Sequence, residues 1–118
     1  AGLVVLSSIW ERAAREGKYS YTITKAAIGG LVRAASVDLA PRGIRINALM
    51  PSVIDTPMTR AALSDDQIAR VADQTGYRAL VSADQIASVT ETLLSDATRG
   101  VTGQSIPVDH GFTHARTL

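Results

Sequence analysis

The sequence predicts an α/β fold built on a parallel sheet. Apolar runs such as "LVVLS" at residues 3–7 show no alternation, which is typical of strands that are covered on both faces. Segments in which apolar residues recur at helical spacing separate these runs. Strands joined by helical crossovers form parallel sheets with right-handed connections. We therefore expect the order strand, helix, strand, loop with one helix, helix, strand.

The first helix is expected at residues 22–40, after the strand at residues 3–7. Pro41 and Gly43 end it, because proline cannot continue a helix and glycine adopts the left-handed conformation common just after one. Its small residues, which permit close approach of a neighbouring element, are Gly29, Gly30 and Ala34. Its apolar residues at helical spacing are Ile28, Leu31, Val32, Ala35 and Leu39.

A second strand is expected at residues 44–49 and is ended by Pro51. Arg45 and Asn47, within this strand, are expected to support the fold. The polar segment 52–81 follows, and one helix is expected in it. This helix begins with a capping box, in which a serine is followed three residues later by a glutamine, at Ser64 and Gln67.

The last helix and the last strand complete the order. A second capping box, Ser82 with Gln85, precedes a helix expected at about residues 83–95. The segment "GQSIPVDHG", residues 103–111, indicates a third strand. Pro107 lies within it and favours an edge position, because proline has no N–H to donate to a neighbouring strand.

These strands form only part of a sheet. Three strands are about half of a six-stranded doubly wound sheet. Without a neighbour, the strand at residues 3–7 would present an apolar edge, which native proteins normally cover. The chain also starts almost directly in this strand. We therefore expect the C-terminal part of a doubly wound parallel sheet, three strands with flanking helices, that is incomplete without an N-terminal half.

Composition and charge exclude several classes of function. The chain has 118 residues, 46% of them hydrophobic and 19% charged, with a formal net charge of +1. This balance gives no electrostatic reason to expect nucleic acid or an anionic membrane as a partner. Because the chain has no cysteine, disulfides and thiolate chemistry are excluded. No apolar run approaches the length of a membrane span, and a cytoplasmic location is the default expectation.

The stretch "YSYTITKAAIGG" at residues 19–30 holds the candidate chemistry. Tyr21 and Lys25 are four residues apart, so on a helix they lie on one face. A phenol has a pKa of about 10 in water, and a nearby ammonium lowers it enough to make tyrosine a usable acid–base group. Ser7 and Ser8, at the carboxyl end of the first strand, are placed to hold a substrate carbonyl.

Each of these features also has an ordinary structural interpretation. A tyrosine and a lysine at this spacing arise by chance, and alone they favour a surface helix with a partly buried tyrosine. Paired serines at the end of a strand are usually turn or cap residues. The features indicate a function only in combination.

The combination resembles the short-chain dehydrogenase/reductase family. "LVVLSS", followed by Tyr21 and Lys25, resembles its active-site region. "ASVDLAPRGIRINALMPSVIDTPM" is similar to its Ile-Arg-x-Asn strand and Pro-Gly-x-x-x-Thr loop. "LLSDATRGVTGQSIPVDHG" is similar to its C-terminal Thr-Gly-x-x-x-x-Val-Asp-Gly-Gly signature. The resemblance covers nearly the whole chain.

This resemblance implies a fold and an activity. Residues 1–118 would be the C-terminal catalytic half of one Rossmann-like domain. The activity implied is that of an oxidoreductase that transfers hydride between NAD or NADP and an alcohol or ketone substrate. Tyr21 would move the proton, Lys25 would lower the pKa of Tyr21 and bind the nicotinamide ribose, and Ser8 would orient the substrate oxygen. Tyr19 does not fit this register.

Further residues follow from the same resemblance. The residues that would line the cofactor site are Pro51, Val53, Ile54 and Thr56. Ile54 would bind through its backbone, and its side chain is expected in the core. Thr56 would contact a phosphate oxygen, or it caps a helix before Pro57. Trp10 and Glu11 would face the substrate, or they lie in an exposed loop. Ser52 replaces the glycine usual after Pro51.

The resemblance also implies partners and a lid. Residues 56–81 would form a substrate lid, and the helix at residues 22–40 would pack subunits into a dimer or tetramer. His110 and His114 are too few to indicate a metal site, and His110 stands where the family usually has glycine. The glycine-rich dinucleotide loop would belong to the missing N-terminal half. Two alternatives stay open: a truncated, inactive homologue that acts as an interaction module, and a binding-only protein.

Overall fold

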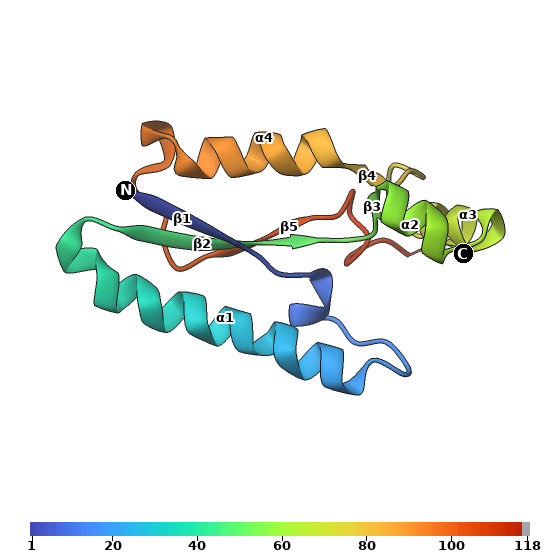
Figure 1. Ribbon diagram of the computed structural model, residues 1–118, viewed down its shortest axis with the longest axis horizontal. Helices are drawn as coiled ribbons and strands as arrows, with labels where there is room; N and C mark the ends of the chain where they lie inside the picture. Colours follow the sequence, from blue (N-terminus) through green and yellow to red (C-terminus); the bar gives the residue numbers. More distant parts are fainter. Residues whose placement is uncertain (117–118) are drawn as a thin grey trace.

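The computed structural model describes residues 1–116 and has a parallel sheet at its centre (Figure 1). The sheet has three strands in the order β1-β2-β5, namely β1 at Gly2–Leu6, β2 at Arg45–Pro51 and β5 at Ser105–Val108. Both pairs of strands are parallel. Helix α1 (Tyr19–Leu39) covers one face and helix α4 (Ala83–Leu94) covers the other (Figure 1). The expected α/β class and the parallel sheet are confirmed.

The central strand β2 is buried on both faces. Its side chains alternate, so that Ile46 and Ala48 pack with Val32 of α1, while Leu49 packs with Ile86 of α4. Leu49 and Ala48 are fully inaccessible to solvent. This double burial explains why the strand reads as a continuous apolar run without alternation.

Arg45 and Asn47 hold the turn between α4 and β5, as expected of residues that support the fold. The buried Asn47 amide donates to the Val101 carbonyl oxygen at 2.9 Å and accepts from the Gln104 N–H at 3.0 Å. The Arg45 guanidinium donates to the carbonyl oxygens of Ser95, Thr98 and Val101. These bonds satisfy backbone oxygens that would otherwise lack partners inside the protein.

The predicted boundaries of α1 and β2 were wrong. Helix α1 begins at Tyr19, three residues before the predicted start at 22, and the preceding residue, Lys18, makes no side-chain cap bond. No N-cap signal was therefore present to mark the true start. Strand β2 continues to Pro51, two residues beyond the predicted end at 49. The proline is tolerated because, at the last position of the strand, its missing N–H removes no hydrogen bond on which the ladder depends.

The segment between β2 and α4 contains more structure than the single predicted helix. Helix α2 (Pro57–Ala62) precedes helix α3 (Asp65–Asp73), which has the predicted capping box. Two short strands, β3 (Ile54–Asp55) and β4 (Val81–Ser82), pair in parallel at the base of this segment. Strands of two residues are too short to show periodicity, which is why the sequence did not indicate them.

Each edge of the described sheet matches an expectation. Strand β5, which contains Pro107, is one edge strand, and it spans fewer residues than the predicted 103–111. Strand β1 is the other edge and has β2 as its sole neighbour within residues 1–116. Leu3 and Leu6 of β1 remain 50% and 56% exposed. An apolar edge of this kind is normally covered in a native protein.

Helix α1 also has an uncovered apolar side. Ile23, Leu31 and Val37 are all more than half exposed in the described chain. The small residue Gly30 faces open space, with nothing within 4 Å of where a Cβ would lie. Within residues 1–116, no helix is both long enough and apolar enough to cross a membrane.

Gly103→Ala is expected to destabilise the fold more than Gly43→Ala. Both glycines have positive φ, 72° and 68°, which costs an alanine about 1–2 kcal/mol. A Cβ at position 103 would also lie 2.6 Å from Ser36 Oγ on α1, whereas one at position 43 meets nothing within 4 Å. The overpacking at Gly103 adds about 1–3 kcal/mol. Urea unfolding of both variants measures the difference, and equal losses would contradict this packing.

Candidate active site

The carboxyl end of β1 places Ser8 in a fixed conformation. The Ser7 N–H donates to the Leu49 carbonyl oxygen at 2.7 Å, so the β1–β2 ladder continues one residue past β1. Ser8 then caps the 3-10 turn Ile9–Glu11, and its Oγ accepts from the Trp10 N–H at 3.2 Å. Ser8 is 7% exposed. The cap interpretation of this serine is confirmed, and the cap holds its hydroxyl in one place.

The turn that follows Ser8 packs closely on α1. A Cβ at Gly29 would lie 2.5 Å from Glu11 Oε1, so a larger residue there would force the Glu11 side chain to shift. The small residue was predicted to permit such a close approach, and this prediction is confirmed. The Glu11 carboxylate lies against α1 and does not line the cleft described below.

Tyr21 and Lys25 lie together at the start of α1. The Lys25 Nζ atom lies 5.5 Å from the centroid of the Tyr21 ring, as the four-residue spacing predicted. The Lys18 Nζ atom lies at 5.8 Å from the same centroid. The sequence analysis missed this second ammonium, although its three-residue spacing from Tyr21 was a usable signal. Tyr19, by contrast, is 84% exposed.

A cleft of about 830 Å³ joins several of the predicted site residues. It lies where the ends of β1 and β2, the start of α1, helices α2 and α3, and the C-terminal segment meet. The predicted residues that line it are Ser8, Trp10, Tyr21, Pro51 and Val53. Lys25, Ile54 and Thr56 do not line it. Ser8 and Tyr21 thus line the same cleft, and Lys25 lies next to the Tyr21 ring without lining the cleft itself.

The cleft also has walls that the sequence did not predict. Phe112, from the C-terminal segment, meets Trp10 edge to face, with ring centroids 6.2 Å apart. Helix α3 contributes Gln67, Arg70 and Val71. These residues come together only through the fold, and no local pattern in the sequence pointed to them.

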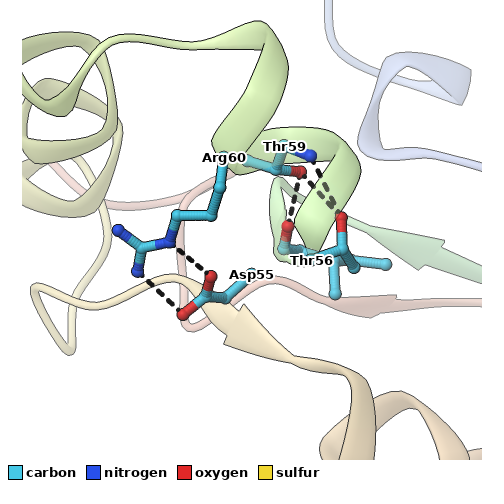
Figure 2. A network of polar contacts seen from close by, with 5 residues as sticks. Asp55, Thr56, Thr59 and Arg60 are labelled. Atoms are coloured by element: carbon cyan, nitrogen blue, oxygen red, sulfur yellow. Dashed lines mark hydrogen bonds and ion pairs between the residues drawn. The ribbon is translucent and has the colours of Figure 1, made fainter.

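Thr59 forms hydrogen bonds to Thr56 (Figure 2) and to the backbone of Ile54. The Thr59 hydroxyl donates to the Ile54 carbonyl oxygen at 2.7 Å. Thr56 caps α2, since its Oγ1 accepts from the Thr59 N–H at 3.2 Å and donates to Thr59 Oγ1. The Ile54 side chain packs against the core around Leu49, as expected. The cap interpretation of Thr56 is confirmed.

An ion pair beside this cap ties α2 to β3. Arg60 Nε and Nη2 donate to the two Asp55 carboxylate oxygens at 2.8 and 2.9 Å (Figure 2). These hydrogen bonds from Arg60 lower the pKa of Asp55 below its usual value. The same bonds raise the pKa of Arg60. The pair is at the surface, so it fixes geometry more than it stabilises the fold.

Asp109 organises the C-terminal segment that carries Phe112. Its carboxylate is 8% exposed and accepts from the backbone N–H groups of Gly111 and Thr113 and from the Thr113 hydroxyl. Burial acts to raise the pKa of Asp109, but the hydrogen bonds from Thr113 and Gly111 lower it more, so it lies below its usual value. The resulting turn brings Phe112 and Thr113 to the cleft.

His110 ties three segments together outside the cleft. Its ring nitrogens lie 3.0 Å from the Ala79 carbonyl oxygen and 2.9 Å from Gln85 Oε1, and the ring stacks on Tyr77. Its φ is 49°, a left-handed backbone conformation that glycine adopts most readily. Within residues 1–116, no three His, Cys, Asp or Glu side chains gather as a metal site requires.

The sequence matches the family model described as enoyl-(acyl carrier protein) reductase over residues 1–113. The chain belongs to the short-chain dehydrogenase/reductase family. It is 33% identical to L-xylulose reductase of Bos taurus, over 92% of this chain and 46% of that protein. It is 34% identical to a 3-oxoacyl-(acyl-carrier-protein) reductase of Salmonella typhimurium, over 93% of this chain and 45% of that protein.

Solved structures of the family agree with the fold. A short-chain type dehydrogenase/reductase from Mycobacterium ulcerans has a TM-score of 0.91 and 30% identity, over 98% of this chain and 42% of that one. This match supports the Rossmann-like fold for the described sheet. The chain spans less than half the length of the relatives that it matches.

Asp109→Asn is expected to lower the free energy of unfolding at neutral pH by about 1–3 kcal/mol, because it weakens hydrogen bonds to a charged acceptor. The pKa of Asp109 is lowered in the folded state, so its stabilisation is present above the unfolded carboxyl pKa and is lost as pH falls through the folded value. The gap between wild type and variant should therefore be largest near neutral pH and shrink below about pH 4.

Urea unfolding at several pH values measures this gap. Asp38→Asn, on the exposed surface of α1, is the matched control and should change stability by less than about 0.5 kcal/mol. A gap at Asp109 that stays constant down to pH 2 would contradict the role of its charge.

Proposed function

We propose that this chain is the C-terminal catalytic half of an NAD- or NADP-dependent oxidoreductase that acts on an alcohol or ketone. One observation carries the proposal: Ser8 and Tyr21 line the same cleft, and the Lys25 ammonium lies over the Tyr21 ring. Family membership supports oxidoreductase chemistry, since the named relatives are reductases.

Tyr21 is the acid–base residue in this proposal. A phenol donates or accepts a proton at its oxygen, which lets a tyrosine beside the substrate act as a general acid or base. Two ammonium groups, those of Lys18 and Lys25, lie within 6 Å of the ring centroid, at 5.8 and 5.5 Å. Tyr21 is partly exposed toward the cleft, where a substrate oxygen would take the proton.

Ser8 orients the substrate oxygen. Its cap bond uses Oγ as an acceptor, so the hydroxyl proton stays available for a second partner. A substrate carbonyl between Ser8 and Tyr21 would accept from both hydroxyl groups. Because Ser8 is held by its cap and by the β1–β2 ladder, this donor is positioned before substrate arrives.

The cofactor would lie beside these residues. Two donors of this chain suit the acceptors of the cofactor. The Lys25 ammonium would bind the ribose hydroxyls. The Thr56 hydroxyl donates to Thr59 Oγ1 in this structure and would donate to a phosphate oxygen when the cofactor binds. Pro51, Val53 and the backbone of Ile54 would flank the nicotinamide. When bound, the nicotinamide supplies or accepts the hydride at the substrate carbon.

The rest of the protein would complete this site. The N-terminal half would pair with the open edge of β1, cover Leu3 and Leu6, and supply the glycine-rich loop for the pyrophosphate. Residues 56–81 would act as a lid, which α3 supports because its residues line the cleft. The exposed apolar side of α1 would pack against a second subunit in a dimer or tetramer. We place the enzyme in the cytoplasm.

Tyr21→Phe is expected to lower kcat by about 100-fold or more, because general acid–base catalysis contributes roughly that factor. Tyr19→Phe is the matched control, since this exposed tyrosine, two residues away, faces solvent. Steady-state kinetics with NADH and NADPH measures both variants, and far-ultraviolet circular dichroism checks that they fold. A Tyr21→Phe enzyme with more than a tenth of the wild-type kcat would overturn the assignment.

Native mass spectrometry of the purified protein, with and without NADH and NADPH, tests the proposed completion. We expect a species heavier than this chain, either one longer polypeptide or two associated ones, that gains the mass of one cofactor per site. Only 12.4 kDa chains or their multiples, without cofactor, would show that the chain alone is no dehydrogenase.

A further inference from the structure

All charged side chains that line the cleft within the described residues are arginines. They come from three separate parts of the fold: Arg15 from the loop before α1, Arg70 from α3 and Arg116 from the C-terminal segment. No carboxylate of residues 1–116 lines the cleft. The whole chain carries a net charge of only +1. The positive charge of the cleft is therefore a local property and does not follow from composition.

Within residues 1–116, the arginines of the cleft differ from Arg60 and Arg78 in having no carboxylate at ion-pair distance. Outside the cleft, Arg60 pairs with Asp55, and Arg78 lies 4.0 Å from Asp73. No carboxylate oxygen of residues 1–116 lies within 4.0 Å of the nitrogen atoms of Arg15, Arg70 or Arg116. Uncompensated positive charge in a concave site concentrates anions there. The planar guanidinium binds carboxylates through paired hydrogen bonds.

The remaining walls combine apolar and polar side chains. The larger hydrophobic side chains among them are Ile9, Trp10, Val53, Leu63, Val71 and Phe112. Ser8 and Tyr21 supply hydroxyl groups at the end of the cleft near the sheet. A ligand that fits all three features has an oxygen function for the hydroxyl groups, a nonpolar body and an anionic group for an arginine.

We infer that the substrate is an oxo acid or hydroxy acid with a nonpolar body, and that Arg70 binds its anionic group. This inference rests on the proposed function and names its substrate class. Of the three arginines, Arg70 alone lies on a helix, α3, which begins with a capping box and buries Ile68. The anionic group takes no part in the redox step, which occurs at the carbonyl or alcohol carbon next to Tyr21.

The same arginines would have a different role if they bound phosphates of the cofactor. In that case their loss would raise the KM for NADH or NADPH and would affect every substrate equally. An anion-binding role for the substrate changes only the discrimination between charged and neutral substrates. The two roles therefore predict different kinetics, and a comparison of matched substrates separates them.

The test uses the complete protein and ketones of two chain lengths, and within each length the compared acid and amide differ in charge. The probes are 4-oxopentanoate and 7-oxooctanoate, each with its primary amide and with the phosphonate of equal chain length. We expect kcat/KM to be at least about tenfold higher for the better carboxylate than for its amide, since a hydrogen bond to a charged group is worth about 1.5–3 kcal/mol. The phosphonates show whether the site prefers a carboxylate or a phosphate-like group.

Arg70→Gln should reduce the ratio of kcat/KM for acid over amide by about tenfold or more. Arg78→Gln is the matched control, because Arg78 does not line the cleft. This variant should leave the ratio unchanged. Amides that react as well as the acids in the wild type would overturn the inference while the proposed function stands. An Arg70→Gln enzyme with an unchanged ratio, or with a raised KM for cofactor alone, would also overturn it. Failure to oxidise NADH or NADPH with any probe or neutral ketone would count against the proposed function itself.

Discussion

The parallel pairing of β2 with strands on both sides is the constraint on which the rest of the structure depends. The register of this pairing brings the carboxyl ends of β1, β2 and β5 to the same end of the sheet, because Leu6 is opposite Leu49 and Pro51 is opposite Val108. Ser8, the loop after Pro51 and the C-terminal segment therefore leave the sheet side by side. The alternation of its buried side chains fixes this register, since a slip of one residue would exchange the two faces.

In the Ser8 hydroxyl, the oxygen accepts the cap hydrogen bond, while the proposed chemistry uses the proton. Ser8 and Thr56 both cap short helical segments with a hydroxyl oxygen that accepts a hydrogen bond. The Ser8 cap leaves the hydroxyl proton for another partner, whereas the Thr56 hydroxyl donates its proton to Thr59 Oγ1. The structural and functional interpretations of such residues are therefore compatible, and the cap itself orients the donor. Asp109 acts in a comparable way at a distance, because its carboxylate shapes the turn that presents Phe112.

The sequence predicted those parts of the molecule that local pattern determines. β1 and β2 follow from continuous apolar runs, and α1 and α4 follow from apolar residues at helical spacing. Both capping boxes follow from spacings of three residues, and Tyr21 with Lys25 follows from a spacing of four. The missed features depend on contacts between distant segments. Phe112 meets Trp10 from the opposite end of the chain, and β3 is stabilised only by its pairing with β4. The start of α1 was missed for a different reason: it has no cap.

The short pairing of β3 with β4 has a consequence for how the protein can diverge. Ile54 lies beside Val81 and Asp55 beside Ser82, so the segment between them enters and leaves the body at neighbouring points. Lengthening a loop whose ends are already fixed costs little, about 0.6 kcal/mol for each doubling of its length. The segment also contacts the C-terminal turn, where the Gly76 N–H donates to the His110 carbonyl oxygen. Insertions or deletions between residues 56 and 75 would therefore change the walls of the cleft while the pairing of β1, β2 and β5 stays in place.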